Sequence, residues 1–199
     1  GPLLEYLYES KGIEVLLAQE THVLAAKLPT VQSTAQDAGF KGVWAAATPT
    51  EGGSQGGVAV LAPSHVQVTA PPGRPSPTLE EGRVVAGHVH WGPKGFVAIS
   101  CYFRDGEGLQ GPNLATLWTV VKYLHELNAR GHDWVLAGDW NMPFDQLNKA
   151  GWLQQVDGVL MQPNATTCRK VLPGSVIDLP FVSRNLHLRF APGAEVDEL

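Results

Sequence analysis

The sequence predicts an α+β fold in which two β-sheets pack as a two-layer sandwich and helices flank it. Short apolar runs rich in β-branched residues alternate along the 199 residues with stretches of helical periodicity. Glycine and proline separate most of these runs, and no internal repeat is present. A single domain over 1–199 is expected, because a chain of this length with 44% hydrophobic residues can bury about 70% of its unfolded surface.

The first half of the chain is expected to alternate between helices and strands. The end of a helix over Leu3–Ser10 leads into a strand that ends at Glu20, and helical character over 23–38 is interrupted at Pro29. The glycine-rich stretch 52–57 lacks the Gly-Lys-Ser/Thr of a phosphate loop, so a mobile loop is expected there. Further strands are predicted near 43–47, 57–61 and 66–69.

The second half contains a predicted hairpin and the clearest helix. Two strands over 83–103 are joined through Gly-Pro-Lys-Gly. Strands are also predicted over 134–139 and around Asp178, where Pro180 indicates an edge or a bulge because it cannot donate a ladder hydrogen bond. Periodicity over Asn113–Ala129 predicts a helix whose apolar face contains Leu114, Leu117, Trp118, Val121, Leu124 and Leu127.

The segment Gly-Asp-Trp-Asn at 138–141 carries the most chemical information. Asp139 and Asn141 stand two residues apart at the end of an apolar run, so an extended backbone would point both to one side and Trp140 to the other. Such a carboxylate and carboxamide can contact a metal-bound water and a phosphate oxygen together. The same residue types are typical of a turn, which is the alternative interpretation.

Two more carboxylates belong to predicted strands. Glu20 ends the first one, and Asp178 lies within an apolar run where an ionised carboxylate needs a histidine, an arginine or a metal as partner. Strand ends in layered sheets gather ligands, so these acids are expected near Asp139. With Asn141 they form an oxygen-rich set suited to Mg²⁺ or Mn²⁺.

These residues resemble the endonuclease/exonuclease/phosphatase superfamily, which includes apurinic-site endonucleases, pancreatic-type deoxyribonucleases and retroelement endonuclease domains. The resemblance implies a DNase I-like fold of four layers, α/β/β/α, with a metal-dependent site that hydrolyses phosphodiesters. The matching motifs follow the family's order: Gln-Glu-Thr at 19–21, Gly-Gly at 56–57, Arg83, Ser-Cys-Tyr at 100–102, Gly-Asp-Trp-Asn at 138–141 and Ser-Val-Ile-Asp at 175–178.

The resemblance implies a role for each polar residue. Glu20 would bind the metal, and Tyr102 would donate a hydrogen bond to the phosphate or the leaving group. Asp139 would orient or deprotonate the attacking water, while Asn141 holds water and phosphate in line. Asp178 would orient the family's histidine. Cys101 is expected to face the core, opposite Tyr102, and not to act as a nucleophile.

The chain also departs from the family pattern. Arg104-Asp105 replaces the usual Pro-Asn after the tyrosine, and Arg104 is a candidate substrate contact. Arg169, a second such candidate, belongs to a basic group that either contacts a nucleic-acid backbone or is a solvated face. That group comprises Arg169, Lys170, Arg184 and Arg189. The family's first-strand asparagine and terminal Ser-Asp-His are not found, so a truncated fragment or incomplete gene model with impaired activity is expected.

Composition narrows the partners and the compartment. The net charge of −5 argues against a strongly basic protein that wraps nucleic acid. It is compatible with a nuclease, because a bound metal ion adds positive charge to the site. DNA rather than RNA is the expected partner. A monomer without membrane contact is expected, because no run approaches the roughly 20 apolar residues of a membrane span. The two cysteines form no disulfide framework, which favours an intracellular compartment, nuclear or cytoplasmic.

Two other functional hypotheses stay open. One is a catalytically inactive remnant that binds nucleic acid or a protein. The other is a phosphatase of the same family that acts on a phosphoinositide or a nucleotide. Substrate choice in this family would depend on the loops between the shared motifs.

Overall fold

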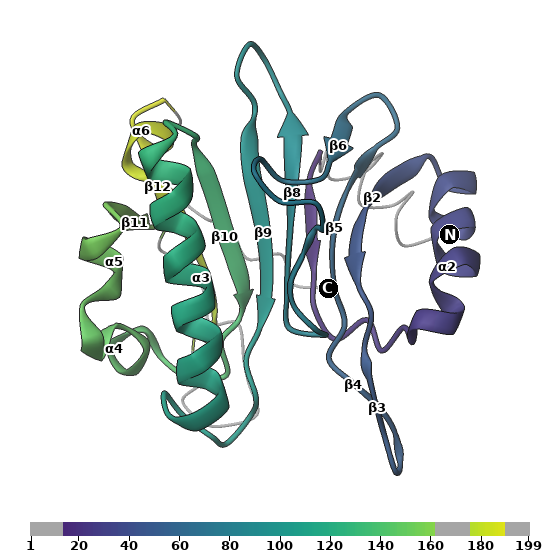
Figure 1. Ribbon diagram of the computed structural model, residues 1–199, viewed down its shortest axis with the longest axis horizontal. Helices are drawn as coiled ribbons and strands as arrows, with labels where there is room; N and C mark the ends of the chain where they lie inside the picture. Colours follow the sequence, from purple (N-terminus) through teal and green to yellow (C-terminus); the bar gives the residue numbers. More distant parts are fainter. Residues whose placement is uncertain (1–13, 162–175, 190–199) are drawn as a thin grey trace. The chain divides into compact units, whose positions relative to one another are not determined.

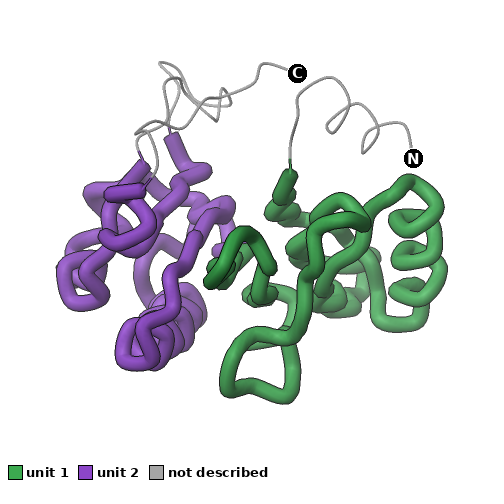
Figure 2. The backbone as a smooth tube through the Cα atoms, turned by 90° about the horizontal axis from the view of Figure 1, so that it is seen from above, with its two compact units in different colours: residues 1–100 green, residues 101–199 purple. Residues whose placement is uncertain are grey.

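The computed structural model describes residues 14–161 and 176–189 (Figure 1). The chain divides into two compact units, Gly1–Ser100 and Cys101–Leu199, which Figure 2 shows in different colours. Strand β9 (Phe96–Tyr102) crosses the boundary between them. The single domain expected over 1–199 stays a prediction, and the predicted helix over Leu3–Ser10 lies outside the described residues.

The first unit contains a three-stranded antiparallel sheet in the order β1-β5-β2. Its strands are β1 (Leu16–Ala18), β2 (Phe40–Ala45) and β5 (Val58–Pro63). Helix α2 (Leu28–Asp37) covers one face, where Ala35 packs with side chains of β2 and β5. Every residue of β5 is buried, since both faces of the sheet are covered, and its sequence is accordingly apolar without alternation.

A second sheet of the first unit packs against the first one. It contains β6 (Gln67–Thr69), β8 (Val84–His90) and the β9 residues of this unit, and β7 (Thr78–Glu80) also pairs with β8. At Gly87 of β8 a methyl group would lie 2.9 Å from Val43 Cγ2 and 3.6 Å from Val60 Cγ1 of the facing sheet. The two sheets are therefore in direct contact, and the predicted two-layer sandwich is present.

Two details of the first unit differ from expectation. The stretch 52–57 is not a simple loop, because Gly53–Gln55 (β4) pairs with Thr48–Thr50 (β3) in an antiparallel hairpin that projects from the sandwich (Figure 1). Pro29 lies in the first turn of α2 and does not interrupt it. Proline is well tolerated there, since the first helical N–H groups have no intrahelical acceptor.

The second unit has an antiparallel sheet in the order β10-β12-β11. The strands are β10 (Trp134–Asp139), β11 (Gly158–Leu160) and β12 (Asp178–Ser183). Helix α3 (Gly111–Ala129) lies along this sheet in Figure 1. The short helices are α4 (Phe144–Leu147), η3 (Asn148–Ala150), α5 (Trp152–Gln155) and α6 (Arg184–His187), and the 3-10 turn η2 (Ala25–Lys27) precedes α2 in the first unit.

Helix α3 confirms the predicted helix but not all of its apolar face. Leu117, Val121, Leu124 and Leu127 are buried as expected. Trp118 is 44% exposed, so its assignment to the core was wrong. The buried stripe continues through other positions instead, namely Asn113, Thr116, Val120 and Tyr123. No helix in 14–161 or 176–189 is long and apolar enough to cross a membrane.

Pro180 lies in a strand with neighbours on both sides, so the expected edge or bulge was wrong. It stands opposite Ala137 of β10 in an uninterrupted register. Its carbonyl accepts from Met161 N at 2.9 Å, just past the end of β11 at Leu160. The N–H and C=O groups of one residue in an antiparallel strand point to the same neighbouring strand. The N–H that proline lacks would therefore point toward the end of β11, so no hydrogen bond to β10 is lost.

Candidate functional site

The strand that carries Asp139 passes very close to strand β9. A methyl group at Gly138 would lie 2.0 Å from the Cys101 carbonyl oxygen and 2.5 Å from Cys101 Sγ. Only glycine allows this approach. The residue before Asp139 therefore sets the distance between β10 and the end of β9, where Tyr102 is located.

Asp139 and Asn141 are brought together by a turn and not by strand alternation. Strand β10 ends at Asp139, and Asn141 has a left-handed backbone with φ of +50°. Asn141 N donates to Asp139 Oδ1 at 2.9 Å, and Asn141 Nδ2 donates to the Phe103 carbonyl at 2.8 Å. The turn interpretation was therefore right about the backbone, and asparagine is one of the few residues that tolerate this conformation.

Trp140 anchors this turn in the core of the second unit. Its side chain is fully buried, and its Nε1 donates to the Leu179 carbonyl at 2.9 Å. Its ring packs edge to face on Phe103 and Phe181, with centroids 4.8 and 5.4 Å apart, and stacks on Trp152 at 6.1 Å. These aromatic contacts fix the Trp140 side chain in the core. The backbone between Asp139 and Asn141 is therefore held in place.

Asp178 stands directly opposite Asp139. The two are paired in the register of β10 and β12, at the last residue of one strand and the first of the other. The expectation that Asp178 lies near Asp139 is thus confirmed. Asp178 is half-buried at the strand end and not enclosed within an apolar strand, which reduces the cost of its charge.

Tyr102 and Cys101 end strand β9 with different environments. Tyr102 is 6% exposed, and the next residue, Phe103, donates its backbone N–H to the Asp139 carbonyl at 2.9 Å. Cys101 is fully buried, as expected. Burial raises the pKa of the Cys101 thiol well above its usual value, and the nearby Asp139 charge raises it further. The neutral thiol is a poor nucleophile.

Asn113 holds the loop that follows Tyr102, a role that the sequence reasoning missed. Its Oδ1 accepts from Arg104 N at 2.8 Å, and its Nδ2 donates to the carbonyls of Arg104 and Gly108, both at 2.9 Å. Asn113 is 1% exposed. The sequence signal for this role was a polar asparagine at a buried position of helix α3. The Arg104 guanidinium is half-exposed and lies 3.8 Å from Glu107.

Glu20 belongs to the first unit and follows β1 by two residues. It is exposed and has a left-handed backbone with φ of +49°, so the strand predicted to end at Glu20 stops at Ala18. The preceding residue, Gln19, is fixed by Nε2 donating to Ser100 Oγ at 2.9 Å, while Ser100 Oγ donates to the Ala18 carbonyl at 3.0 Å. Ser100 is a second positioning residue that the sequence reasoning did not identify.

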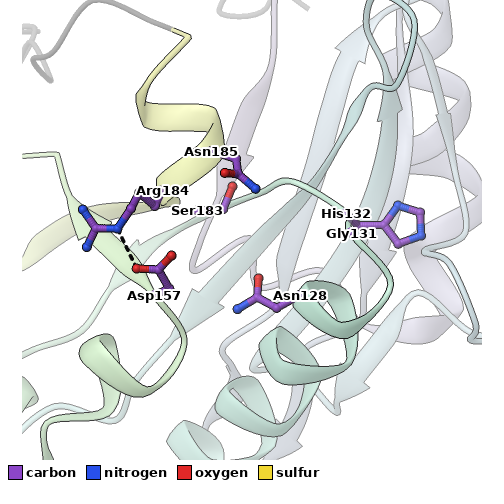
Figure 3. Close-up of a pocket in the computed structure, with 7 residues that line it drawn as sticks. All are labelled: Asn128, Gly131, His132, Asp157, Ser183, Arg184 and Asn185. Atoms are coloured by element: carbon purple, nitrogen blue, oxygen red, sulfur yellow. Dashed lines mark hydrogen bonds and ion pairs between the residues drawn. The ribbon is translucent and has the colours of Figure 1, made fainter.

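The predicted basic group is partly neutralised by acids from elsewhere in the second unit. Arg184 Nε contacts Asp157 Oδ1 at 2.6 Å, as Figure 3 shows, and Arg189 NH1 contacts Asp133 Oδ2 at 2.9 Å. Arg169 lies outside the described residues. Arg184 and Asp157 also line a cavity of about 210 Å³ with Asn128, Gly131, His132, Ser183 and Asn185. These residues lie near the start of β10, whereas Asp139 is at its end.

The second unit thus brings together the Asp139 and Asp178 strand ends and the Asn141 amide, and Tyr102 precedes Phe103, whose backbone bonds to Asp139 and Asn141; Glu20 belongs to the first unit. In 14–161 and 176–189, no cluster of three His, Cys, Asp or Glu side chains could hold a metal ion. The Asp139–Asp178 pair supplies oxygen donors of the type that Mg²⁺ prefers, and such an ion keeps several waters in its shell. The chemistry of the donor set fits a hydrated Mg²⁺.

Comparison with known proteins identifies the fold. No protein-family model and no curated protein sequence matches the chain. NExo, a 3′-5′ exonuclease from Neisseria meningitidis, matches with 20% identity and a TM-score of 0.63 over 92% of this chain and 82% of that chain. A structure of the 3′ phosphatase NExo bound to a product DNA hairpin matches with 20% identity and a TM-score of 0.58, over 92% and 81%.

A third match comes from a mobile element. The endonuclease domain of TRAS1, a telomere-specific non-LTR retrotransposon, is 13% identical with a TM-score of 0.63, over 92% of this chain and 78% of that chain. The chain therefore has the α+β, DNase I-like fold of endonuclease/exonuclease/phosphatase proteins, and the fold predicted from the sequence is confirmed.

Proposed function

We propose that this chain is a Mg²⁺-dependent phosphodiesterase that hydrolyses phosphodiester bonds in nucleic acid, with Mn²⁺ as an alternative metal. The observation that carries the proposal is the Asp139–Asp178 register pair, with Asn141 folded onto the Asp139 carboxylate. Two carboxylates directly opposite each other repel unless a cation or a proton lies nearby. The fold shared with nucleases supports the same conclusion.

Each residue has a role that its surroundings allow. Asp139 accepts a proton from the attacking water or orients it, with its carboxylate held in place by the Asn141 amide. Asn141 donates one side-chain N–H to the Phe103 carbonyl; its other N–H can donate to a phosphate oxygen, and its Oδ1 can accept from a water. Tyr102 donates its hydroxyl proton to the phosphate or the leaving group.

Glu20 is the proposed metal ligand, and its exposed position after β1 suits a carboxylate that must reach a hydrated ion. When bound, Mg²⁺ would neutralise charge that develops on the phosphoryl oxygens. Asp178 adds negative charge beside Asp139. Arg104 contacts the substrate, because its half-exposed guanidinium is only loosely paired with Glu107.

DNA is the proposed substrate, and a retroelement-type or repair-type endonuclease is the proposed subclass. Two observations support DNA: NExo was solved with a DNA hairpin, and TRAS1 contributes an endonuclease domain. At these low identities the similarity itself establishes the fold.

The test is cleavage of supercoiled plasmid and of a duplex with one abasic site, with Mg²⁺ and with EDTA. We expect Mg²⁺-dependent nicking by the wild-type chain and a loss of about 10²–10⁴-fold in Asp139→Asn, which removes the charge but keeps the shape. Asp145→Asn is the matched control, since it neutralises an exposed acid of the same unit. Equal cleavage by wild type and Asp139→Asn would contradict the proposal.

Phosphatase activity is the second candidate, favoured by the description of NExo as a 3′ phosphatase. An oligonucleotide with a 3′-phosphate tests it in the same assay. Release of inorganic phosphate without any nicking would assign the site to phosphomonoesters. Absence of both reactions, with Mg²⁺ binding retained, would favour the non-catalytic binding module.

A further inference from the structure

The turn that presents Glu20 has an unfavourable backbone. Glu20 and His22 both adopt the left-handed conformation, with φ of +49° and +54°. Residues that bear a Cβ rarely occupy this region, and glutamate is not among the types enriched there. Neighbouring segments must therefore hold residues 20–22 in this conformation.

Two backbone hydrogen bonds hold the turn from one side. Thr21 N donates to the Gly57 carbonyl and His22 N donates to the Gly56 carbonyl, each at 3.0 Å. The contact depends on glycine, because a methyl group at Gly57 would lie 2.4 Å from Thr21 Oγ1. The segment before β5 therefore acts as a close support for the Glu20 turn.

The β3–β4 hairpin supplies a second, reciprocal contact through His22 and Ser54. Ser54 Oγ donates to the His22 carbonyl at 3.0 Å. His22 Nδ1 and the Ser54 carbonyl are 2.9 Å apart, and since a carbonyl only accepts, Nδ1 carries the proton. Ser54 is the central residue of β4, whereas both residues beside it in the strand are exposed. One side chain of the hairpin and one of the turn thus bind each other's backbone.

We propose that His22 and Ser54 are positioning residues that fix the Glu20 turn and make the β3–β4 hairpin part of the metal site. The inference rests on the proposed function, in which Glu20 is a metal ligand. Loss of either contact removes one restraint on the left-handed backbone at residue 22, two residues from the ligand.

Matched variants separate positioning from folding. Ser54→Ala removes one of the two reciprocal contacts, and His22→Ala removes the other. His22→Asn is the rescue variant, since its amide nitrogen can take the place of Nδ1 and asparagine tolerates the left-handed backbone. Gln55→Ala is the control for an exposed change in the same strand. Circular dichroism and the melting temperature check that all variants fold.

The experiment measures Mn²⁺ binding by electron paramagnetic resonance and amide hydrogen exchange at Thr21 and His22 by NMR. We expect Ser54→Ala and His22→Ala to bind Mn²⁺ about five-fold more weakly and to exchange these two amides faster. His22→Asn and Gln55→Ala should behave as wild type. The double variant should be little worse than either single variant, because both contacts belong to one restraint.

Two results would overturn the inference in distinguishable ways. If Glu20→Gln weakens Mn²⁺ binding but Ser54→Ala and His22→Ala do not, the metal site stands and the positioning role of His22 and Ser54 is refuted. If Glu20→Gln binds Mn²⁺ as wild type does, Glu20 is not a ligand, and the proposed metal site fails together with the inference. Faster amide exchange without any change in Mn²⁺ affinity would likewise refute the positioning role of His22 and Ser54 and leave the metal site standing.

Discussion

Asp139 and Asp178 face each other across β10 and β12, as the final residue of one strand and the first of its antiparallel partner. Directly opposed strand residues have Cα atoms about 4.5–5.5 Å apart, so like charges there destabilise the pair. A cation at this position would relieve this repulsion.

The first prediction concerns the charge of this pair. Asp178→Asn should stabilise the metal-free chain by about 0.5 kcal/mol, because it removes a like charge opposite Asp139. The same variant should reduce the stabilisation by Mg²⁺, which amounts to about 1.4 kcal/mol for wild type at ten times the dissociation constant, because it removes one of the two negative charges of the pair. Urea unfolding with and without Mg²⁺ measures both quantities.

Asp145→Asn controls for a change of net charge in the same unit, since Asp145 is exposed in helix α4. It should leave both quantities within about 0.5 kcal/mol of wild type, as surface substitutions usually do. A destabilised Asp178→Asn chain with an unchanged response to Mg²⁺ would mean that the carboxylate serves the fold and not a cation.

The second prediction concerns the loop after Tyr102. Asn113→Ala should destabilise the chain by about 1–3 kcal/mol, because it leaves the partly buried backbone groups of Arg104 and Gly108 without their Asn113 partner. Asn113→Asp keeps the acceptor for Arg104 N and loses the two donated bonds. Its urea midpoint should therefore fall as well, and proteolysis in the 104–108 loop should become faster. A loop that stays as resistant as in wild type would show that Asn113 does not hold it.

The third prediction concerns Gly138. Gly138→Ala should destabilise the chain by about 1–3 kcal/mol or more, because its methyl group would overlap the Cys101 carbonyl. Gly52→Ala is the control, since a methyl group at Gly52 would meet nothing within 4 Å. Thermal unfolding followed by circular dichroism compares the two. Equal melting temperatures would show that β9 and β10 separate at little cost.

The fourth prediction concerns the Cys101 thiol in a Cys168→Ser background. Burial and the Asp139 charge raise the pKa of Cys101, so the folded chain should react with a thiol reagent only through unfolding at neutral pH. Because the folded pKa lies above the unfolded one, stability is fully present below pH 9 and should fall as pH rises beyond it. Rapid labelling at pH 7 in the absence of denaturant would contradict this burial.

The sequence alone determined the order of the main elements and which residues of the second unit are candidates for the site. Local periodicity predicts helix α3 and strands β5, β8, β9 and β10. A helix with one buried face has apolar residues at helical spacing, and a fully buried strand has a continuous apolar run. Asp139 and Asn141 were recognisable since both residue types and their spacing are local. Cys101 was placed in the core on the same ground.

Tertiary structure decided how those residues are held. The turn at Asn141, the register that sets Asp139 against Asp178 and the loop fixed by Asn113 each depend on residues far apart in the sequence. The same reason explains the exposed Trp118 and the pairing of Arg184 with Asp157. A local sequence pattern indicates how hydrophobic a segment is. The residues that a side chain contacts depend on packing and hydrogen bonding between distant segments, which a local pattern does not contain.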